Sequence, residues 1–278
     1  MSESKVKLDL LTKIKYLTIH CVSFSIFGLM CLGYMLIIPV IFFVFRNNDL
    51  KRYQVNQYLT HFGFRFVVWF CDKVGFIKIR LMNPEKRNHL KPVLVANHLT
   101  MFDIVAVFCY FPGYTTFVHR KFLKNPFLYP IIKSCGYIAV NPLCPSDRQK
   151  AMAIASDYLK QGMRLVIFPE GKRSKNGKLS PFQSGAFYLS VVNKVGISSI
   201  FFTCDQSFLN NQKMFIVRDK PIELNVWLMP EIPTDDLSAD RKNVKKLKKD
   251  TELLYDVWMK SEKSLPWNKL ESFVNDLN

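Results

Sequence analysis

The stretch Val93-Leu94-Val95-Ala96-Asn97-His98-Leu99-Thr100-Met101-Phe102-Asp103 runs from a short apolar segment into a histidine and then a carboxylate. The first four residues have the composition of a buried strand, and the residues after Thr100 have helical spacing. Residues five apart on a continuous helix point about 140° away from each other, because the helix has 3.6 residues per turn. His98 and Asp103 can therefore meet only if His98 lies in a strand-to-helix turn. We expect Thr100 to be the N-cap, which places Asp103 at the third helical position and directs it back toward the turn.

The chemistry that this geometry allows is general base catalysis. Asp103 would accept a hydrogen bond from one imidazole nitrogen of His98, which leaves the other nitrogen to take a proton. The alternative is a helix cap beside an incidental histidine, and a short pattern taken alone favours that alternative. The location at the end of a buried strand favours catalysis, because ligands of α/β sheets gather there.

A second block, Phe168-Pro169-Glu170-Gly171-Lys172-Arg173-Ser174, follows the apolar residues 164–167. The backbone amides beside Gly171, together with Lys172 and Arg173, suit a phosphate group. The alternative is a surface hairpin that leads to Asn176-Gly177, in which Glu170 and Lys172 are merely solvated. Two such blocks at strand ends of one sheet favour a shared site.

From about Val74 onward, short β-rich runs alternate with helical patterns, which predicts an α/β fold with a mixed, largely buried sheet flanked by helices. The expected strands are Phe76–Leu81, Val93–Ala96, Thr115–Val118, Tyr137–Val140, Arg164–Phe168, Ser199–Cys204, Phe215–Val217 and Glu223–Trp227. The expected helices are Met101–Tyr110, Lys121–Ser134, Asp147–Gln161, Phe182–Lys194 and Ala239–Met259.

The N-terminal region contains a membrane segment, because Tyr16–Phe45 runs thirty residues without a formally charged side chain. A single span needs ~20 apolar residues. The segment is therefore a tilted helix, or a helix broken near Pro39 that lies along the interface, or part of a hairpin. Phe62–Cys71 is too short to span and is interrupted by Arg65, which predicts an interfacial helix.

The charge balance is strongly basic, with 39 Lys and Arg against 22 Asp and Glu and a net charge of +17. Such a balance favours anionic partners such as phospholipid headgroups or an acidic carrier protein. The helix Ala239–Met259 concentrates this charge on the face Arg241–Lys249, which is a headgroup contact, a carrier-protein contact or a solvated face. The buried strands and the membrane segment argue against nucleic acid as a partner.

The seven scattered cysteines indicate free thiols in a reducing compartment.

The two blocks resemble those of the lysophospholipid acyltransferases of the 1-acylglycerol-3-phosphate O-acyltransferase type. Asn97-His98-x4-Asp103 resembles the family's N-H-x4-D block, and Phe168–Ser174 resembles its F-P-E-G-T-R-S block with Lys172 where Thr is usual. Residues 118–130 and the segment Pro181-Phe182-Gln183-Ser184-Gly185-Ala186 resemble further family segments in the same order. The resemblance covers residues 93–231.

This resemblance implies a membrane-associated O-acyltransferase that moves a fatty acyl chain from acyl-ACP or acyl-CoA, as co-substrate, to a lysolipid hydroxyl. His98 would act as general base with Asp103 as the other catalytic residue, and the substrate-binding residues would be Asn97, Glu170, Gly171, Lys172 and Arg173. Glu170 would hold an acceptor hydroxyl or brace the turn. No cofactor and no metal are expected, and the partners are membrane lipids and an acyl carrier protein.

The expected regions are 1–72, a membrane anchor with an interfacial helix, and 73–278, an α/β acyltransferase domain with a basic C-terminal helix. The expected location is the bacterial inner membrane, with the active site on the cytoplasmic side.

The sequence also departs from this family. In the family, the strand that follows Gly136 usually ends in an arginine, which helps to hold the acceptor phosphate. This chain instead continues Tyr137-Ile138-Ala139-Val140-Asn141-Pro142, which contains no arginine. This departure favours as an alternative an acceptor other than a phosphatidate precursor, such as an ornithine lipid, a glycolipid or an aryl-polyene lipid. An alternative of another class is a non-enzymatic, lipid-binding membrane adaptor.

Overall fold

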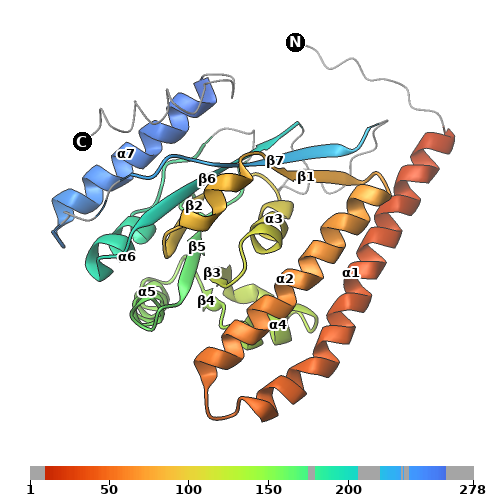
Figure 1. Ribbon diagram of the computed structural model, residues 1–278, viewed down its shortest axis with the longest axis horizontal. Helices are drawn as coiled ribbons and strands as arrows, with labels where there is room; N and C mark the ends of the chain where they lie inside the picture. The colour runs from red at the N-terminus through yellow and green to blue at the C-terminus, as the bar shows by residue number, and fades with distance from the viewer. Residues whose placement is uncertain (1–9, 175–178, 206–219, 233, 235–237, 261–278) are drawn as a thin grey trace.

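The structure is a computed structural model that describes residues 10–174, 179–205, 220–232, 234 and 238–260 (Figure 1). In this part of the chain, seven strands form one sheet in the order β1-β7-β6-β2-β5-β3-β4. The strands are β1 Ile77–Leu81, β2 Val93–Ala96, β3 Tyr114–His119, β4 Ile138–Val140, β5 Arg164–Ile167, β6 Ile197–Cys204 and β7 Ile222–Leu228. This arrangement confirms the predicted mixed α/β fold.

The strand directions bring the two sequence blocks together. β2 pairs in parallel with both β5 and β6, and β5, β3 and β4 continue the parallel run. β7 is antiparallel to β6, which makes the sheet mixed. Because β2 and β5 are adjacent and parallel, the residues that follow them lie beside each other at the carboxyl edge of the sheet.

Helices cover both faces of the sheet (Figure 1). One face is covered by α1 Leu10–Val44, α2 Asp49–Lys73, α3 Phe102–Tyr110 and α4 Leu128–Ser134, and the other by α5 Pro145–Lys160, α6 Gly185–Asn193 and α7 Arg241–Lys260. Short 3-10 helices η1 Pro84–His89 and η2 Arg120–Lys124 lie between strands and helices. Side chains of β2 alternate between the two cores, since Leu94 and Ala96 pack on the α3 side and Val93 and Val95 on the α6 and α7 side.

Several predicted elements need correction. The single helix expected over Lys121–Ser134 is divided into η2 and α4, because Asn125 precedes Pro126 and takes an extended conformation. Oδ1 of Asn125 then accepts hydrogen bonds from the amides of Phe127 and Leu128, which starts the second helix. α6 begins at Gly185, later than the expected Phe182. The expected strand Phe215–Val217 lies outside the described residues.

The N-terminal region is a helical hairpin in which α2 is much longer than the expected Phe62–Cys71. α1 continues through Pro39, which agrees with an unbroken helix in a hairpin and excludes the alternative of a helix broken at this residue. The hairpin turns at Asn48, whose side chain accepts a hydrogen bond from the amide of Lys51 and caps α2. α2 also adds Val67, Val68 and Cys71 to the core below the sheet.

α1 has an unusual distribution of side chains. The buried stripe that faces the rest of the protein contains Tyr16, His20, Ser23, Cys31 and Ile41, most of which are polar or carry sulfur. The exposed surface is apolar and includes Leu17, Phe24, Leu29, Leu32, Leu36, Val40 and Phe43. Ile14–Val44 is long and apolar enough to cross a membrane. A soluble helix has the reverse distribution, so the outer surface of α1 suits lipid rather than water.

Candidate active site

His98 and Asp103 are in direct contact at the carboxyl end of β2. Nδ1 of His98 lies 2.8 Å from Oδ2 of Asp103, and the carboxylate is fully buried while the imidazole is 20% exposed. The same carboxylate oxygen accepts hydrogen bonds from the amides of Leu99 and Thr100 at 2.5 and 2.8 Å. The imidazole ring also lies against Phe168, with 4.3 Å between the ring centroids. Asp103 therefore fixes Nδ1 as the donor and leaves Nε2 as the nitrogen that can accept a proton.

The cap of α3 differs from the prediction. The N-cap position is Met101, which makes no side-chain cap hydrogen bond, and Asp103 is the second helical residue rather than the third. Thr100 lies one position before this N-cap. Its hydroxyl accepts a 3.0 Å hydrogen bond from the amide of Phe102 and donates a 3.0 Å hydrogen bond to Oδ1 of Asp103. Thr100 thus supports Asp103 from outside the helix.

Asn97 extends the pairing of β2 with β6. Its side-chain oxygen accepts a 2.7 Å hydrogen bond from the amide of Phe202, and its side-chain nitrogen donates a 3.0 Å hydrogen bond to the carbonyl of the same residue. The side chain is almost fully buried. Both ends of the amide therefore hold the backbone of β6, and a contact between Asn97 and substrate stays a prediction.

Glu170 braces the turn that carries His98. Oε1 accepts a 2.9 Å hydrogen bond from the amide of His98, and Oε2 accepts a 2.8 Å hydrogen bond from the amide of Ser180. Burial raises the pKa of the Glu170 carboxyl, although these two hydrogen bonds oppose the shift. This geometry corresponds to the bracing alternative for Glu170, and it connects the loop after β5 to the loop after β2.

The other residues of the second block differ in exposure. Gly171 has φ of +68°, a backbone conformation that favours glycine, and its amide donates to the carbonyl of Phe168 to close the turn. The side chain of Lys172 is exposed and that of Arg173 is half-buried. The amide of Ser174 donates a 2.7 Å hydrogen bond to the carbonyl of His98. The two blocks are thus joined by backbone as well as by Glu170, and their cations lie at the same edge as His98.

A third group of polar residues lies beyond β3 and β4 at this edge. Arg120, just after β3, forms a two-pronged ion pair with Asp147 on α5. The same carboxylate accepts a 2.6 Å hydrogen bond from the amide of Asn141, the residue that follows β4. These hydrogen bonds hold the pKa of Asp147 below its ordinary value. Arg120 lies within the family-like segment 118–130, but its pairing with Asp147 has no local signal in the sequence, because the two residues are 27 positions apart.

α7 reaches the same region through Tyr255, whose contacts are buried, and through Glu252, whose contact is partly buried. The hydroxyl of Tyr255 lies 2.7 Å from the carbonyl of Ile200 and 3.1 Å from that of Val95. Oε1 of Glu252 accepts a 2.7 Å hydrogen bond from the amide of Phe182, in the segment that follows the second block. Tyr255 belongs to the buried stripe of α7, and helical spacing alone contains no signal for a buried hydroxyl contact.

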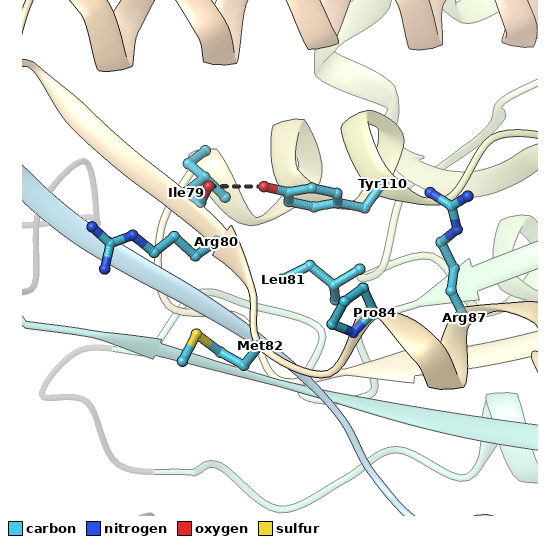
Figure 2. A pocket seen from close by; sticks show the side chains of 7 residues that line it. All are labelled: Ile79, Arg80, Leu81, Met82, Pro84, Arg87 and Tyr110. Atoms are coloured by element: carbon cyan, nitrogen blue, oxygen red, sulfur yellow. Dashed lines mark hydrogen bonds between the residues drawn. The ribbon is translucent and has the colours of Figure 1, made fainter.

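A separate pocket of about 490 Å³ lies between β1, η1 and the end of α3. Figure 2 shows the hydroxyl of Tyr110 bonded to the carbonyl of Ile79, with Arg80 and Arg87 on opposite sides of the apolar lining. None of the predicted site residues lines this pocket. It is therefore distinct from the edge that carries His98.

Comparisons with known proteins agree with the fold. A family profile described as Acyltransferase matches residues 78–202. The 1-acyl-sn-glycerol-3-phosphate acyltransferase beta of Homo sapiens is 28% identical over 179 residues, which cover 62% of this chain and 63% of the human protein. The 1-acyl-sn-glycerol-3-phosphate acyltransferase of Cocos nucifera is 23% identical over 192 residues, covering 68% of this chain and 59% of the plant protein. The matched segments thus span less than two thirds of these relatives.

A solved structure extends the similarity to nearly the whole chain. The crystal structure of the 1-acyl-sn-glycerophosphate acyltransferase PlsC from Thermotoga maritima superposes with a TM-score of 0.68 at 16% identity, over 92% of this chain and 99% of that protein. At this identity the superposition shows a shared fold. The family profile over residues 78–202 contains both sequence blocks, so this part of the chain is similar to the acyltransferase family in sequence as well as in fold.

Proposed function

We propose that the chain is a membrane-associated O-acyltransferase that moves a fatty acyl chain from acyl-ACP or acyl-CoA to the hydroxyl of a lysophospholipid, such as 1-acylglycerol-3-phosphate or a related lysolipid. The observation that carries this proposal is the hydrogen bond between Asp103 and Nδ1 of His98 at the carboxyl edge of the sheet. It leaves Nε2 to act on an acceptor hydroxyl, which is the task that acyl transfer to oxygen requires.

The reaction needs no covalent acyl-enzyme. Nε2 of His98 removes the hydroxyl proton while the acceptor oxygen attacks the thioester carbonyl and forms the new C–O bond. The C–S bond then breaks, and the imidazolium returns the proton to the leaving sulfur, which departs as a thiol. Asp103 stabilises the imidazolium and holds its orientation. The amides of Leu99 and Thr100 are already used by Asp103, so they are not candidates to hold the oxyanion.

The second block supplies charge for the substrates. Lys172 and Arg173 lie on the loop that Glu170 ties to His98, and cations at that place would bind the acceptor headgroup or the phosphates of the donor. Glu170 acts as a positioning residue for the turn. Asn97 positions the end of β2 through its contacts with Phe202.

Membrane attachment is supported by the distribution of side chains on α1. Tyr34 in this helix bonds Asn56 of α2 and Ser134 of α4, and Phe27 stacks on Phe64 of α2, so α1 is held against the domain along its length. A helix held in this way lies along the surface of the bilayer and inserts its apolar outer face. The proposed location is the cytoplasmic side of a bacterial inner membrane, where a lysolipid acceptor and a soluble thioester can meet.

A second candidate is the same reaction with an acceptor that lacks the phosphate of a phosphatidate precursor. The observation that favours it is at the end of β4, where Asn141 stands in place of a cation and the nearby Arg120 is already paired with Asp147. An ornithine lipid, a glycolipid or an aryl-polyene lipid would then be the acceptor.

The experiment that tests both candidates uses detergent-solubilised protein and labelled acyl-ACP and acyl-CoA. The acceptors are lysophosphatidate, lyso-ornithine lipid and a glycolipid, and each assay is repeated with His98→Ala. Product that depends on His98 supports the transferase, and the acceptor that gives product decides between the candidates. Equal activity of His98→Ala and wild type, or no transfer to any acceptor, would instead favour a lipid-binding adaptor.

A further inference from the structure

α7 carries the densest positive charge in the described part of the chain. The nine residues Arg241–Lys249 contain six cations and no carboxylate. Arg241, Lys242, Lys245, Lys246 and Lys249 are exposed, while Val244 and Leu247 of the same segment are buried against the domain. Asp250 interacts with Lys246 and Lys249, and Asp240, directly before the helix, interacts with Lys242. Lys248 lies 3.8 Å from Glu252. The exposed residues form one continuous surface, here named the basic face.

The stability of the helix does not explain this charge. Arg241 and Lys242 occupy the first turn, where the helix dipole is positive and anionic side chains are favoured. Lys245 lies four residues after Arg241 and four before Lys249, and like charges at this spacing repel each other on a helix. Asp240 caps the N-terminus of the helix through the amide of Asn243, but one carboxylate does not balance six cations. The basic face therefore works against the helix that carries it. Such a surface is suited to an anionic partner.

The position of α7 separates the basic face from the lipid-facing helix. α7 packs with α5 and α6 on one side of the sheet, and the α1–α2 hairpin covers the opposite side (Figure 1). When the outer face of α1 lies in the bilayer, the sheet stands between the membrane and α7. A partner of the basic face therefore comes from the aqueous side.

α7 also connects the basic face with the reactive edge. Glu252 holds the amide of Phe182 after the second block, and Tyr255 contacts the carbonyl of Val95, three residues before His98. Along the helix axis, Lys245 is about 10 Å and Arg241 about 16 Å from Glu252, at 1.5 Å per residue. A partner bound to the basic face is thus within reach of the site only if its thioester is carried on an extended, flexible arm.

We infer that the basic face is the docking surface for an acidic acyl carrier protein that delivers the thioester donor. The inference rests on the proposed acyl transfer and deepens it by naming the form in which the donor arrives. A carrier protein supplies both properties that the surface requires, an acidic exterior and a thioester at the end of a long prosthetic arm. Docking through opposite charges mainly raises the rate of encounter and its salt dependence.

The test compares Lys245→Glu/Lys246→Glu/Lys249→Glu with the wild type, using the same acyl chain on carrier protein and on CoA. We expect the KM for the acylated carrier to rise at least about tenfold with kcat little changed, since these are exposed charges at the rim of a contact. The KM for acyl-CoA should stay within about twofold. Binding of the unacylated carrier, followed by fluorescence anisotropy, should weaken in parallel, and for the wild type it should fall steeply with added salt.

The matched control is Lys73→Glu/Arg80→Glu/Arg87→Glu, which makes the same change in net charge at exposed positions around β1 and should leave carrier binding unchanged. The inference would be overturned if the α7 variant showed equal rises in its KM values for the acylated carrier and for acyl-CoA, or no rise in either. It would also be overturned if the wild type transferred the acyl chain from acyl-CoA alone. So would a loss of binding to phosphatidylglycerol micelles with an unchanged KM for the carrier, which would identify a headgroup contact. If the wild type uses neither donor, the proposed function fails, and carrier binding alone decides the role of α7.

Discussion

The amide of His98 donates a 2.9 Å hydrogen bond to Oε1 of Glu170, a residue 72 positions later in the chain. The other carboxylate oxygen holds Ser180, so a single buried side chain ties the loop after β2 to the loop after β5. The position of the imidazole is therefore set by two carboxylates, Asp103 through the ring and Glu170 through the backbone.

Glu170 predicts a dependence of stability on pH. Burial raises the pKa of this carboxyl above its ordinary value of 4.5, so the folded protein binds a proton more readily than the unfolded chain. The stability contributed by protonation is then present at low pH and is lost as pH rises through the raised pKa. Glu170→Gln removes this dependence. Thermal unfolding in detergent between pH 4.5 and 7 should show the wild type losing stability relative to the variant as pH rises, and parallel pH profiles would contradict the assignment.

Asp103→Asn tests the role of the carboxylate in orienting His98. The asparagine oxygen can still accept the amides of Leu99 and Thr100, so the fold should be kept, but the charge that stabilises the imidazolium is lost. We expect kcat to fall about 10²- to 10⁴-fold with little change in KM. An unchanged melting temperature provides the control. A variant as active as the wild type would leave Asp103 as a helix cap only.

Asn97→Ala separates a structural from a substrate-binding role. The substitution leaves the buried amide and carbonyl of Phe202 without their partner, and each orphaned group costs about 1–3 kcal/mol. We expect a clear loss of thermal stability. If stability is unchanged and the KM for the acceptor rises instead, Asn97 contacts substrate.

Lys172→Met reports on the charge of the acceptor. For an acceptor with a phosphate, losing a charged hydrogen bond of about 1.5–3 kcal/mol should raise the acceptor KM roughly tenfold or more. For a neutral acceptor the KM should change little. Lys160→Met, at an exposed position of α5, is the matched control in the same steady-state assay.

The outer face of α1 predicts the strength of membrane attachment. Leu29, Leu32 and Leu36 are 66%, 48% and 79% exposed on this face, and inserting a leucine side chain contributes about 1.5–3 kcal/mol. Replacing all three by serine should shift much of the protein from the membrane pellet to the soluble fraction. Leu143, Ile154 and Leu253 are exposed elsewhere, and serine at those positions should leave the protein in the pellet.

The sequence predicted local features better than distant contacts. The strand Val93–Ala96 was predicted with its observed bounds, because its composition and the turn that follows are encoded locally. The contact between His98 and Asp103 followed from helix geometry. The split at Pro126 was missed although the residue before a proline is biased against helix, which was a readable signal.

Other parts of the site have no local signal. The contact of Asn97 with Phe202 spans 105 residues, and that of Tyr255 with Val95 spans 160. The full length of α2 was also missed, because its buried polar residues Asn56, Gln57 and His61 interrupt the apolar pattern. Gln57 bonds the carbonyl of Cys135, so this face is buried against another part of the protein and not against an apolar core alone.

The link between His98 and Glu170 also has a consequence for biosynthesis. A nascent chain that has left the ribosome only as far as Asp103 contains both His98 and Asp103, yet the strand beside them and the carboxylate that holds the turn have not been translated. The turn gains its brace once β5 and Ser180 emerge, and β2 gains its cover once Tyr255 follows. Because domains fold as units, the growing polypeptide does not hold His98 in its final position until almost the entire α/β region has been synthesised.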